Sequence, residues 1–317
     1  MVMPLHNKAE HVAAAIESAL AQDFAPFEIV VVDDRSTDGS RDIAASFAGE
    51  RLRLLGREEP GPGGYAARNL GIREARGDWI AFLDADDLWR EDHLAVLARA
   101  IANAPGAGAA ATRFDHVFDT HRQPQRIAQK LEAGAVLDFR QFLECWLEVR
   151  ECPMWTGAIA LRRDVLIDAG LFPEGRARRG GDKDLWLRAM RRTSLAYDPT
   201  FTADFSRDSS NKVSKTTNTL STPCLIGTAR KLMTDADTEE RRLLRRLINQ
   251  EIAHYARYSL KLDQPIRIPL SDVNLPEGLG TLAMLAVTRW TPVSWRKSAY
   301  HFVKSLRAGS ARMRQGQ

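Results

Sequence analysis

Residues 28–34 read Glu28-Ile29-Val30-Val31-Val32-Asp33-Asp34, an apolar run that ends in two aspartates. The four consecutive β-branched residues predict a strand that is buried on both faces, as in a parallel sheet with helices on either side. Because the run stops at Asp33, we expect this carboxylate at the carboxyl end of the strand. Ligands of open parallel sheets bind outside those ends. The stretch therefore predicts an α/β fold with a binding site at this edge.

Strand and helix patterns alternate on both sides of this run. A short strand at Val2 and Met3 comes before it, and further strands are expected at 52–55 and 78–83. Amphipathic helical patterns separate the strands; they cover residues 11–21, 41–47, 65–75 and 91–102. This alternation predicts a doubly wound, mainly parallel sheet flanked by helices.

The rest of the chain is less regular. A small-residue stretch at 104–111 suggests a soft boundary, and a polar loop covers 206–219. Beyond that loop, residues 239–262 predict a long amphipathic helix. We therefore expect three parts: 1–105, 106–219, and a C-terminal helical extension at 220–317.

Charge is unevenly distributed along the chain. The protein has 45 basic and 41 acidic residues and a pI near 9.0. From Gly278 onward there are seven Lys or Arg residues and no acidic ones, which leaves 38 basic against 41 acidic residues elsewhere. The basic character thus belongs to the tail. No stretch has the roughly 18 apolar residues of a spanning helix, and the start lacks signal-peptide features, so we expect a cytoplasmic protein.

A carboxylate cluster, Asp84-Ala85-Asp86-Asp87, follows the strand expected at 78–83. If the extended geometry continues past Leu83, Asp84 and Asp86 lie on the same side. Clustered carboxylates repel one another unless a cation neutralises them, and hard oxygen ligands suit Mg²⁺ or Mn²⁺. The alternative is that these aspartates cap a helix that begins near Leu88.

Four motifs in the first half of the chain resemble those of family 2 glycosyltransferases with the GT-A fold. They are Pro4-Leu5-His6-Asn7, Val31-Val32-Asp33-Asp34-Arg35-Ser36-Thr37-Asp38-Gly39, Ala67-Arg68-Asn69 and Phe82-Leu83-Asp84-Ala85-Asp86-Asp87. Their order and spacing match the family, and the resemblance extends to about residue 215. It implies an inverting, metal-dependent enzyme of the bacterial surface-polysaccharide type. Relatives have apolar residues before the first strand, so we expect the natural chain to start upstream of Met1.

The resemblance implies a donor site in residues 1–105. Its members are Pro4, His6, Asn7, Asp33, Arg68, Asp84 and Ala85, with Mn²⁺ or Mg²⁺ on Asp86. A carboxylate at Asp33 can accept a hydrogen bond from the imide N–H of uracil, which cytosine lacks, so the residue indicates a uracil or thymine base. Of the two, we expect a UDP-sugar as the donor. The alternatives are a turn carboxylate for Asp33 and a solvated helix charge for Arg68. Asp87 is expected to cap or orient.

The candidate base lies in Gly180-Gly181-Asp182-Lys183-Asp184-Leu185-Trp186, which resembles the family's Gly-Glu-Asp-x-Asp-Leu-Trp segment. There the first aspartate deprotonates the acceptor hydroxyl, which corresponds to Asp182. Gly181 replaces the usual glutamate. Asp184 is a rival base, and both aspartates could instead only favour the start of a helix.

Other residues of 106–219 are expected to face the acceptor. Trp155, Thr156 and Gly157 resemble the segment that lines its site, and Trp186 could also stack on a sugar, although core packing is an alternative for each tryptophan. Arg207 and Lys212 lie in the polar loop that closes over the diphosphate in relatives, but the histidine frequent there is missing.

Residues 294–307 predict a basic amphipathic helix that carries Trp295 and Phe302. Such a helix is typical of contact with an anionic membrane surface; packing on the protein is the alternative, and no nucleic-acid motif accompanies the charge. The sequence therefore predicts an enzyme that transfers a sugar from a nucleotide donor to a hydroxyl of a glycan or lipid-linked glycan. The alternatives are a nucleotidyltransferase and a non-catalytic, membrane-associated nucleotide-sugar-binding protein.

Overall fold

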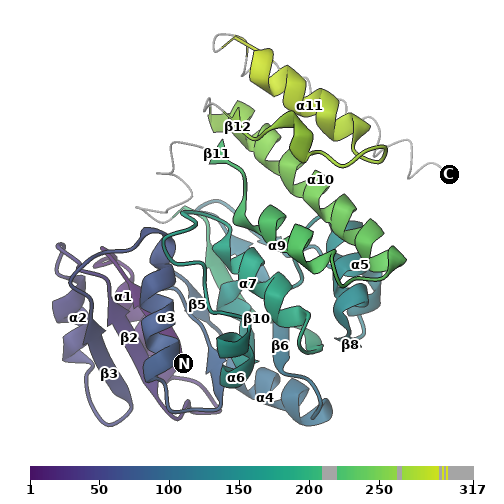
Figure 1. Cartoon of the computed structure of the whole chain (residues 1–317). Coiled ribbons are helices and arrows are strands. Elements are labelled where there is room, and N and C mark those ends of the chain that lie inside the picture. The colour runs from purple at the N-terminus through teal and green to yellow at the C-terminus, as the bar shows by residue number, and fades with distance from the viewer. Residues whose placement is uncertain (209–219, 263–265, 293–294, 296–297, 299–317) are drawn as a thin grey trace. The chain divides into compact units, whose positions relative to one another are not determined.

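A computed structural model of the chain describes residues 1–208, 220–262, 266–292, 295 and 298 (Figure 1). It divides into two compact units, Met1–Thr216 and Thr217–Gln317, each of which is described by itself. The expected division of the first unit at residue 105 stays a prediction.

The first half of unit 1 has the predicted parallel strands. β1 (Val2–Leu5), β2 (Ile29–Asp33) and β3 (Leu52–Gly56) pair in parallel, with β2 in the middle. Every residue of β2 is buried, as the β-branched run predicts. A parallel bridge between Val2 and Phe82 connects these strands to β4 (Trp79–Ala81) and its neighbours.

The second half of the sheet is mixed in direction. β9 (Ile159–Arg162) runs antiparallel to both β4 and β6 (Ala109–Val117), and β6 pairs in parallel with β10 (Leu195–Ser206). Three shorter strands pair antiparallel with β6 or β10; they are β5 (Leu88–Trp89), β7 (Arg122–Pro124) and β8 (Ala135–Leu137).

β6 and β10, the two longest described strands, have no counterpart among our predicted strands. β6 begins within the stretch 104–111 that we expected at a boundary, and its first three residues, Ala109 to Ala111, are fully buried. Alanine has low strand propensity, so the run gave no β signal. Burial in the middle of the sheet overrides that propensity.

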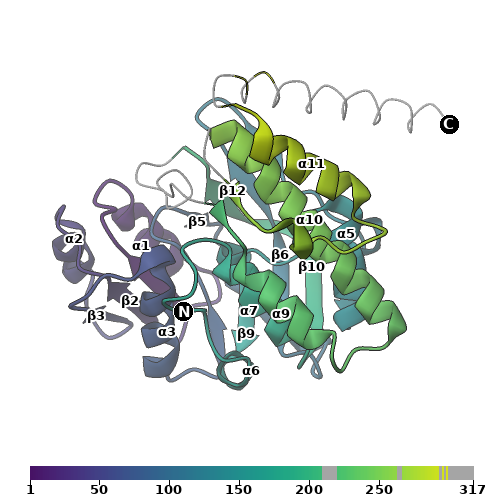
Figure 2. The ribbon, with the colours of Figure 1, turned by 45° about the horizontal axis from the view of Figure 1, so that its top comes forward.

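Helices cover both faces of the sheet. α1 (Val12–Leu20), α2 (Ser40–Ser46) and α4 (His93–Asn103) share one apolar core with the sheet. The other face carries α3 (Tyr65–Glu74) and α7 (Gly181–Met190), and the short α6 (Arg163–Asp168) packs on β9 and α7 (Figures 1 and 2).

Alternation along the strands separates the two cores. Met3 faces the core with α1, whereas Phe82 packs edge-on against Phe172 and beside Trp186 of α7. Gly71 lets α3 approach β1 closely, because a Cβ there would collide with Val2. The fold thereby brings the N-terminal ends of α3 and α7 to the edge where β1, β2 and β4 end.

A capped helix, α5 (Phe139–Val149), completes unit 1. Asp138 and Gln141 form a reciprocal capping box at its start.

Unit 2 is mainly helical. α9 (Cys224–Leu232) and α11 (Leu279–Trp290) pack against α10 (Thr238–Leu262), and β11 (Leu220–Ser221) pairs in parallel with β12 (Ile266–Arg267). Asn249 of α10 exchanges two hydrogen bonds with the backbone of Asn274, of 2.8 and 2.9 Å. Within the described parts of the chain, no helix has the length and apolar character that crossing a membrane requires.

Candidate functional site

The Asp84–Asp87 segment forms a turn at the end of the fourth strand. β4 ends at Ala81, and the backbone N–H of Asp87 donates to the carbonyl of Asp84 over 3.0 Å. The extended geometry on which the same-side placement of Asp84 and Asp86 depended therefore does not continue past Leu83. The helix-cap alternative is also wrong, because the next element is strand β5 and α4 begins only at His93.

Asp84 is held by Arg68 of α3. The guanidinium donates to the Asp84 carboxylate through Nη2 and to the carbonyl of Gly63 through Nη1, over 3.0 Å in the second case. Arg68 is 7% exposed and lies over the ring of Phe172 at 5.5 Å. It is not the solvated helix charge of the alternative interpretation.

Arg68 also keeps an unused donor. Its Nε atom is buried and has no hydrogen-bond acceptor among the described residues. Burial disfavours the charged guanidinium, but the negative charge and the hydrogen bond of Asp84 raise the pKa of Arg68 above its ordinary value. A permanently charged donor with free hydrogen-bonding capacity is suited to an anionic ligand.

Asp86 is paired with Lys8, whose ammonium lies 2.9 Å from Asp86 Oδ2. Both side chains are 11% exposed. Neither residue is near the other in the sequence, and nothing in the motifs predicts the pair. No group of three or more His, Cys, Asp or Glu side chains able to hold a metal occurs within the described parts of the chain. The carboxylate oxygens themselves fit a hard divalent ion, which is usually held by one or two carboxylates together with substrate phosphates.

Asp87 contacts the end of strand β10. It is 1% exposed, and its Oδ1 accepts the backbone N–H of Ser206 at the end of β10 over 2.9 Å. Ala85, between the acidic residues, is buried as well.

The ends of β1 and β2 form the other side of the predicted donor site. Asp33 is 2% exposed; it accepts the N–H of Ser36 and a hydrogen bond from Arg41, each over 3.2 Å. The hydrogen bond from Ser36 is the kind that a turn carboxylate makes, so the turn alternative accounts for one of the two contacts of Asp33. Asn7 has a φ of 50°, and its Oδ1 accepts the N–H of Thr37 over 2.8 Å.

Two further predicted donor residues precede Asn7 in the sequence. Nδ1 of the exposed His6 lies 2.8 Å from the carbonyl of Asp34, and the partly buried Pro4 is the third residue of β1.

Asp182 lies in the first turn of α7 and is partly exposed. Its carboxylate makes no hydrogen bond or ion pair with any residue that the structure describes. Asp184, the rival base, is 2% exposed, and Arg188 binds its Oδ2 over 2.8 and 3.1 Å. Of the two, only Asp182 has a carboxylate that an acceptor hydroxyl could reach.

The predicted acceptor residues differ in how far they are exposed to solvent. Trp155 is partly exposed and stacks on Phe205 of β10 at 4.7 Å. Thr156 and Gly157 are buried beside it, and a Cβ at Gly157 would collide with the Trp155 ring. Trp186 is fully buried, so core packing describes it and a sugar has no access to its ring.

The predicted lid is only partly within the structure. Arg207 is exposed and lies over the ring of Phe205 at 4.8 Å. Lys212 lies outside the described residues, as do most of residues 294–307.

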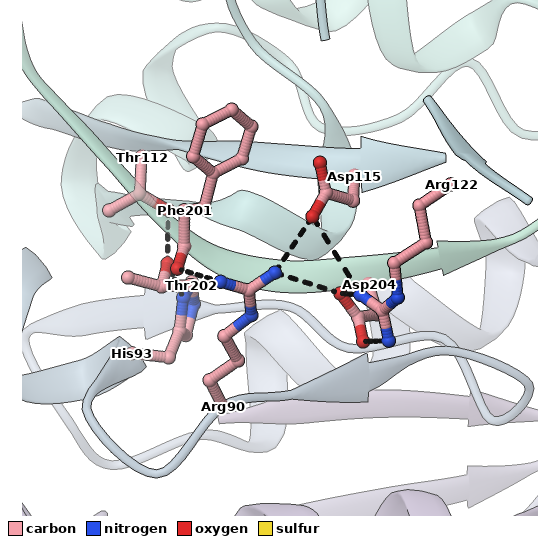
Figure 3. A network of polar contacts seen from close by, with 8 residues as sticks. All are labelled: Arg90, His93, Thr112, Asp115, Arg122, Phe201, Thr202 and Asp204. Carbon is pink, nitrogen blue, oxygen red and sulfur yellow. Dashed lines mark hydrogen bonds and ion pairs between the residues drawn. The ribbon is translucent and has the colours of Figure 1, made fainter. Parts of the chain in front are cut away.

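A second charged cluster, which sequence analysis did not predict, joins β5, β6, β7 and β10 (Figure 3). Arg90 donates to Asp115 over 2.7 Å, and Arg122 binds both oxygens of Asp204 over 2.8 and 2.9 Å. Beside it, the buried His93 contacts Thr202 through Nδ1 over 2.7 Å. The residues come from four separate segments, so no local motif marks them.

Comparison with known proteins identifies the family. Residues 1–168 match the family described as "Glycosyl transferase family 2". The chain belongs to this family. The match covers more than half of the sequence and includes the four motifs in the first half of the chain.

Two relatives have names that describe succinoglycan biosynthesis and glucosyl transfer. The succinoglycan biosynthesis protein ExoO of Rhizobium meliloti is 47% identical over 109 residues, which are 34% of this chain and 30% of that protein. The Escherichia coli UDP-Glc:alpha-D-GlcNAc-diphosphoundecaprenol beta-1,3-glucosyltransferase WfgD is 39% identical over 89 residues, or 28% of this chain and 35% of that protein. The chain thus aligns with about a third of each relative.

A solved structure supports the fold. S. aureus TarS 1-349 in complex with UDP-GlcNAc superposes with a TM-score of 0.65 at 19% identity, covering 100% of this chain and 91% of that one. The fold of this family 2 member is therefore of the GT-A type, as the sequence predicted.

Proposed function

We propose that this protein transfers a sugar from a nucleoside-diphosphate donor, UDP in the first instance, to a hydroxyl acceptor with inversion. One observation carries the proposal: helix α3 links the donor turn to the candidate base, because its Arg68 binds Asp84 and the hydroxyl of its Tyr65 accepts the backbone N–H of Gly181, next to Asp182. Donor turn and candidate base therefore share one neighbourhood, as a displacement between two bound substrates requires.

Each residue has a distinct task in this scheme. Asp182 removes the proton of the acceptor hydroxyl, whose oxygen forms a bond to the anomeric carbon as the bond to the diphosphate oxygen breaks. Asp84 binds the ribose of the donor, and Asp33 accepts the uracil imide N–H. Arg68 offers Nε to the anionic donor.

A divalent ion fits the scheme through Asp86. The carboxylate is a hard oxygen ligand, and Lys8 shows that the position already attracts a cation. Mn²⁺ or Mg²⁺ bound there would neutralise charge on the departing diphosphate.

The proposed acceptor is a lipid-linked glycan, because the name of WfgD specifies a diphosphoundecaprenol-linked sugar as the acceptor of that relative. Trp155 supplies an aromatic ring beside Phe205 for a sugar face. Lid residues Arg207 and Lys212 are assigned to the diphosphate on the family resemblance alone.

The decisive experiment is release of UDP from a panel of UDP-sugars with Mn²⁺, with and without acceptor glycans. We expect acceptor-stimulated release that falls about 10²- to 10⁴-fold in Asp182→Asn, the range for loss of a general base. Asp164→Asn is the matched control, because Asp164 also lies in the first turn of a helix, α6. Full activity of Asp182→Asn would refute the assigned role.

The same assay separates the alternatives. Release of pyrophosphate instead of UDP would identify a nucleotidyltransferase. Saturable UDP binding without turnover on any acceptor would identify a non-catalytic binding protein.

We further propose that unit 2 binds the anionic inner surface of the cell membrane. Leu279, Val287 and Trp290 of α11 are at least half exposed, and Trp295 is 69% exposed. The basic residues that follow in the sequence would attract anionic lipid.

Sedimentation with vesicles tests this surface. We expect binding to phosphatidylglycerol vesicles that weakens with salt and with Trp290→Ser, but not with Phe27→Ser, which removes an exposed apolar residue of unit 1. Equal binding to neutral phosphatidylcholine, or none to either lipid, would contradict the proposal.

A further inference from the structure

Tyr65 links the first turn of α3 to the first residue of α7. Its hydroxyl accepts the backbone N–H of Gly181 over 2.8 Å, across 116 residues of sequence. The first N–H groups of a helix have no partner within the helix itself, and the N-cap of α7, Gly180, has no side chain to supply one. Tyr65 therefore caps the helix that carries Asp182.

The tyrosine ring fills the space beside Gly181. A Cβ at Gly181 would lie 2.7 Å from Tyr65 Cζ and 2.7 Å from Pro173 Cγ, so no larger residue fits without displacement. Tyr65 is 5% exposed and stacks on Phe172 at 5.8 Å with an interplanar angle of 13°. This packing explains why the position holds glycine.

Hydrogen bonds and close contacts surround Tyr65. Asn69, one turn along α3, exchanges two hydrogen bonds with the backbone of Phe172, of 2.9 and 3.1 Å. Gly63 precedes Tyr65 with a φ of 75°, and a Cβ there would lie 2.7 Å from the tyrosine ring. The ring thus has one position, set by α3 on one side and by the segment before α7 on the other.

We propose that Tyr65 is a positioning residue for Asp182. By binding the N–H of Gly181 and excluding a side chain there, it fixes the height and direction of the first turn of α7 relative to α3. Because α3 also carries Arg68, the candidate base is held at a set distance from the donor turn. The inference rests on the proposed function, in which Asp182 is the base.

Tyr65→Phe removes the hydroxyl and keeps the ring. We expect kcat to fall about 10- to 100-fold, the scale for a misplacement of about 1 Å, while the KM of the donor stays unchanged. Tyr197→Phe is the matched control: it removes another buried hydroxyl of unit 1, bonded to Gln125 over 3.3 Å, and should leave kcat unchanged.

A double-mutant cycle with Asp182→Asn distinguishes positioning from general stability. If Tyr65 acts through Asp182, adding Tyr65→Phe to Asp182→Asn changes kcat by less than about two-fold, because the group to be positioned is already absent. A full additional loss in that background, or wild-type kcat in Tyr65→Phe alone, overturns the inference and leaves the role of Asp182 intact. Full activity of Asp182→Asn would instead overturn the proposed function and, with it, this role.

Gly181→Ala provides a second variant. We expect the added Cβ to displace the start of α7 and thereby to lower kcat. The melting temperature of the protein is measured in parallel to show that the variant is folded. Unchanged kcat in a folded Gly181→Ala protein would also contradict the inference.

Discussion

Unit 1 contains two clusters of the same composition, two cations and two aspartates, that are built in different ways. In the donor cluster, Arg68 binds Asp84 and Lys8 binds Asp86. In the network of Figure 3, each arginine reaches both carboxylates: Arg90 lies 2.7 Å from Asp115 and 3.5 Å from Asp204, and Arg122 lies 3.7 and 2.8 Å from the same two.

Burial differs as well. The side chain of Arg68 is 9% exposed, whereas those of Arg90 and Arg122 are 40% and 53% exposed. Arg68 nevertheless retains a buried Nε without an acceptor in the described structure. A buried donor without a partner costs free energy, which a ligand can recover, whereas exposed and cross-linked arginines chiefly join strands. Composition alone therefore does not mark a binding site.

Matched removal of one carboxylate from each cluster is the strongest way to break this comparison. Asp84→Asn leaves Arg68 buried beside a neutral group, so we expect loss of transfer by about 100-fold or more and a loss of stability of about 3 kcal/mol. Asp204→Asn should lower the stability by only about 1 kcal/mol and leave kcat unchanged. UDP-sugar turnover and urea unfolding measure both effects; equal losses of activity in the two variants would refute the distinction.

The network also contains a titratable residue, His93, that stays uncharged in the folded protein. Burial lowers the pKa of His93 to about 3, and its Nε2 has no partner among the described residues. The unfolded chain binds a proton at about pH 6.5 and the folded protein does not, so stability should fall as the pH drops from about 6.5 toward 3.

His93→Gln isolates this effect. Below pH 6.5 we expect wild-type stability to lose about 1.4 kcal/mol per pH unit more than the variant, measured as the free energy of urea unfolding. Parallel pH profiles of the two proteins would show that His93 is protonated when folded.

The smallest expected effect concerns the cation on Asp86. Lys8→Met removes the ammonium that a divalent ion must displace, so we expect Mn²⁺ to bind on the order of 10-fold more tightly, as followed by calorimetry without substrate. Arg122→Met, which removes a cation from the other cluster, should leave Mn²⁺ affinity unchanged. Weaker Mn²⁺ binding by Lys8→Met would mean that the lysine helps to hold the metal.

Local sequence patterns predicted the parts of the fold that they control. The run Ile29 to Val32 predicted a strand buried on both faces, and every residue of β2 is buried. Strand β6 was not predicted, because its first residues are alanines, which pack closely in the core and have low strand propensity.

The sequence predicted which residue types form the candidate site, but it did not predict which of these residues pair with one another. The motifs identify Asp84, Asp86 and Arg68, yet the turn that follows Ala81 places the two aspartates on different cations. Lys8 and Asp86 are 78 residues apart, and Tyr65 and Gly181 are 116 apart. Such contacts depend on how helices pack on the sheet, which periodicity does not specify.

The hydrogen bond between Tyr65 and Gly181 bears on how this protein could be recombined with its relatives. A chimera that takes residues 1–105 from one protein and the remainder from another separates the two partners. If the incoming segment has a larger residue at position 181, that side chain and the Tyr65 ring would compete for the same volume. Exchange of acceptor halves should therefore transfer residues 63–65 together with 180–182, so that the tyrosine and the glycine it accommodates come from the same parent.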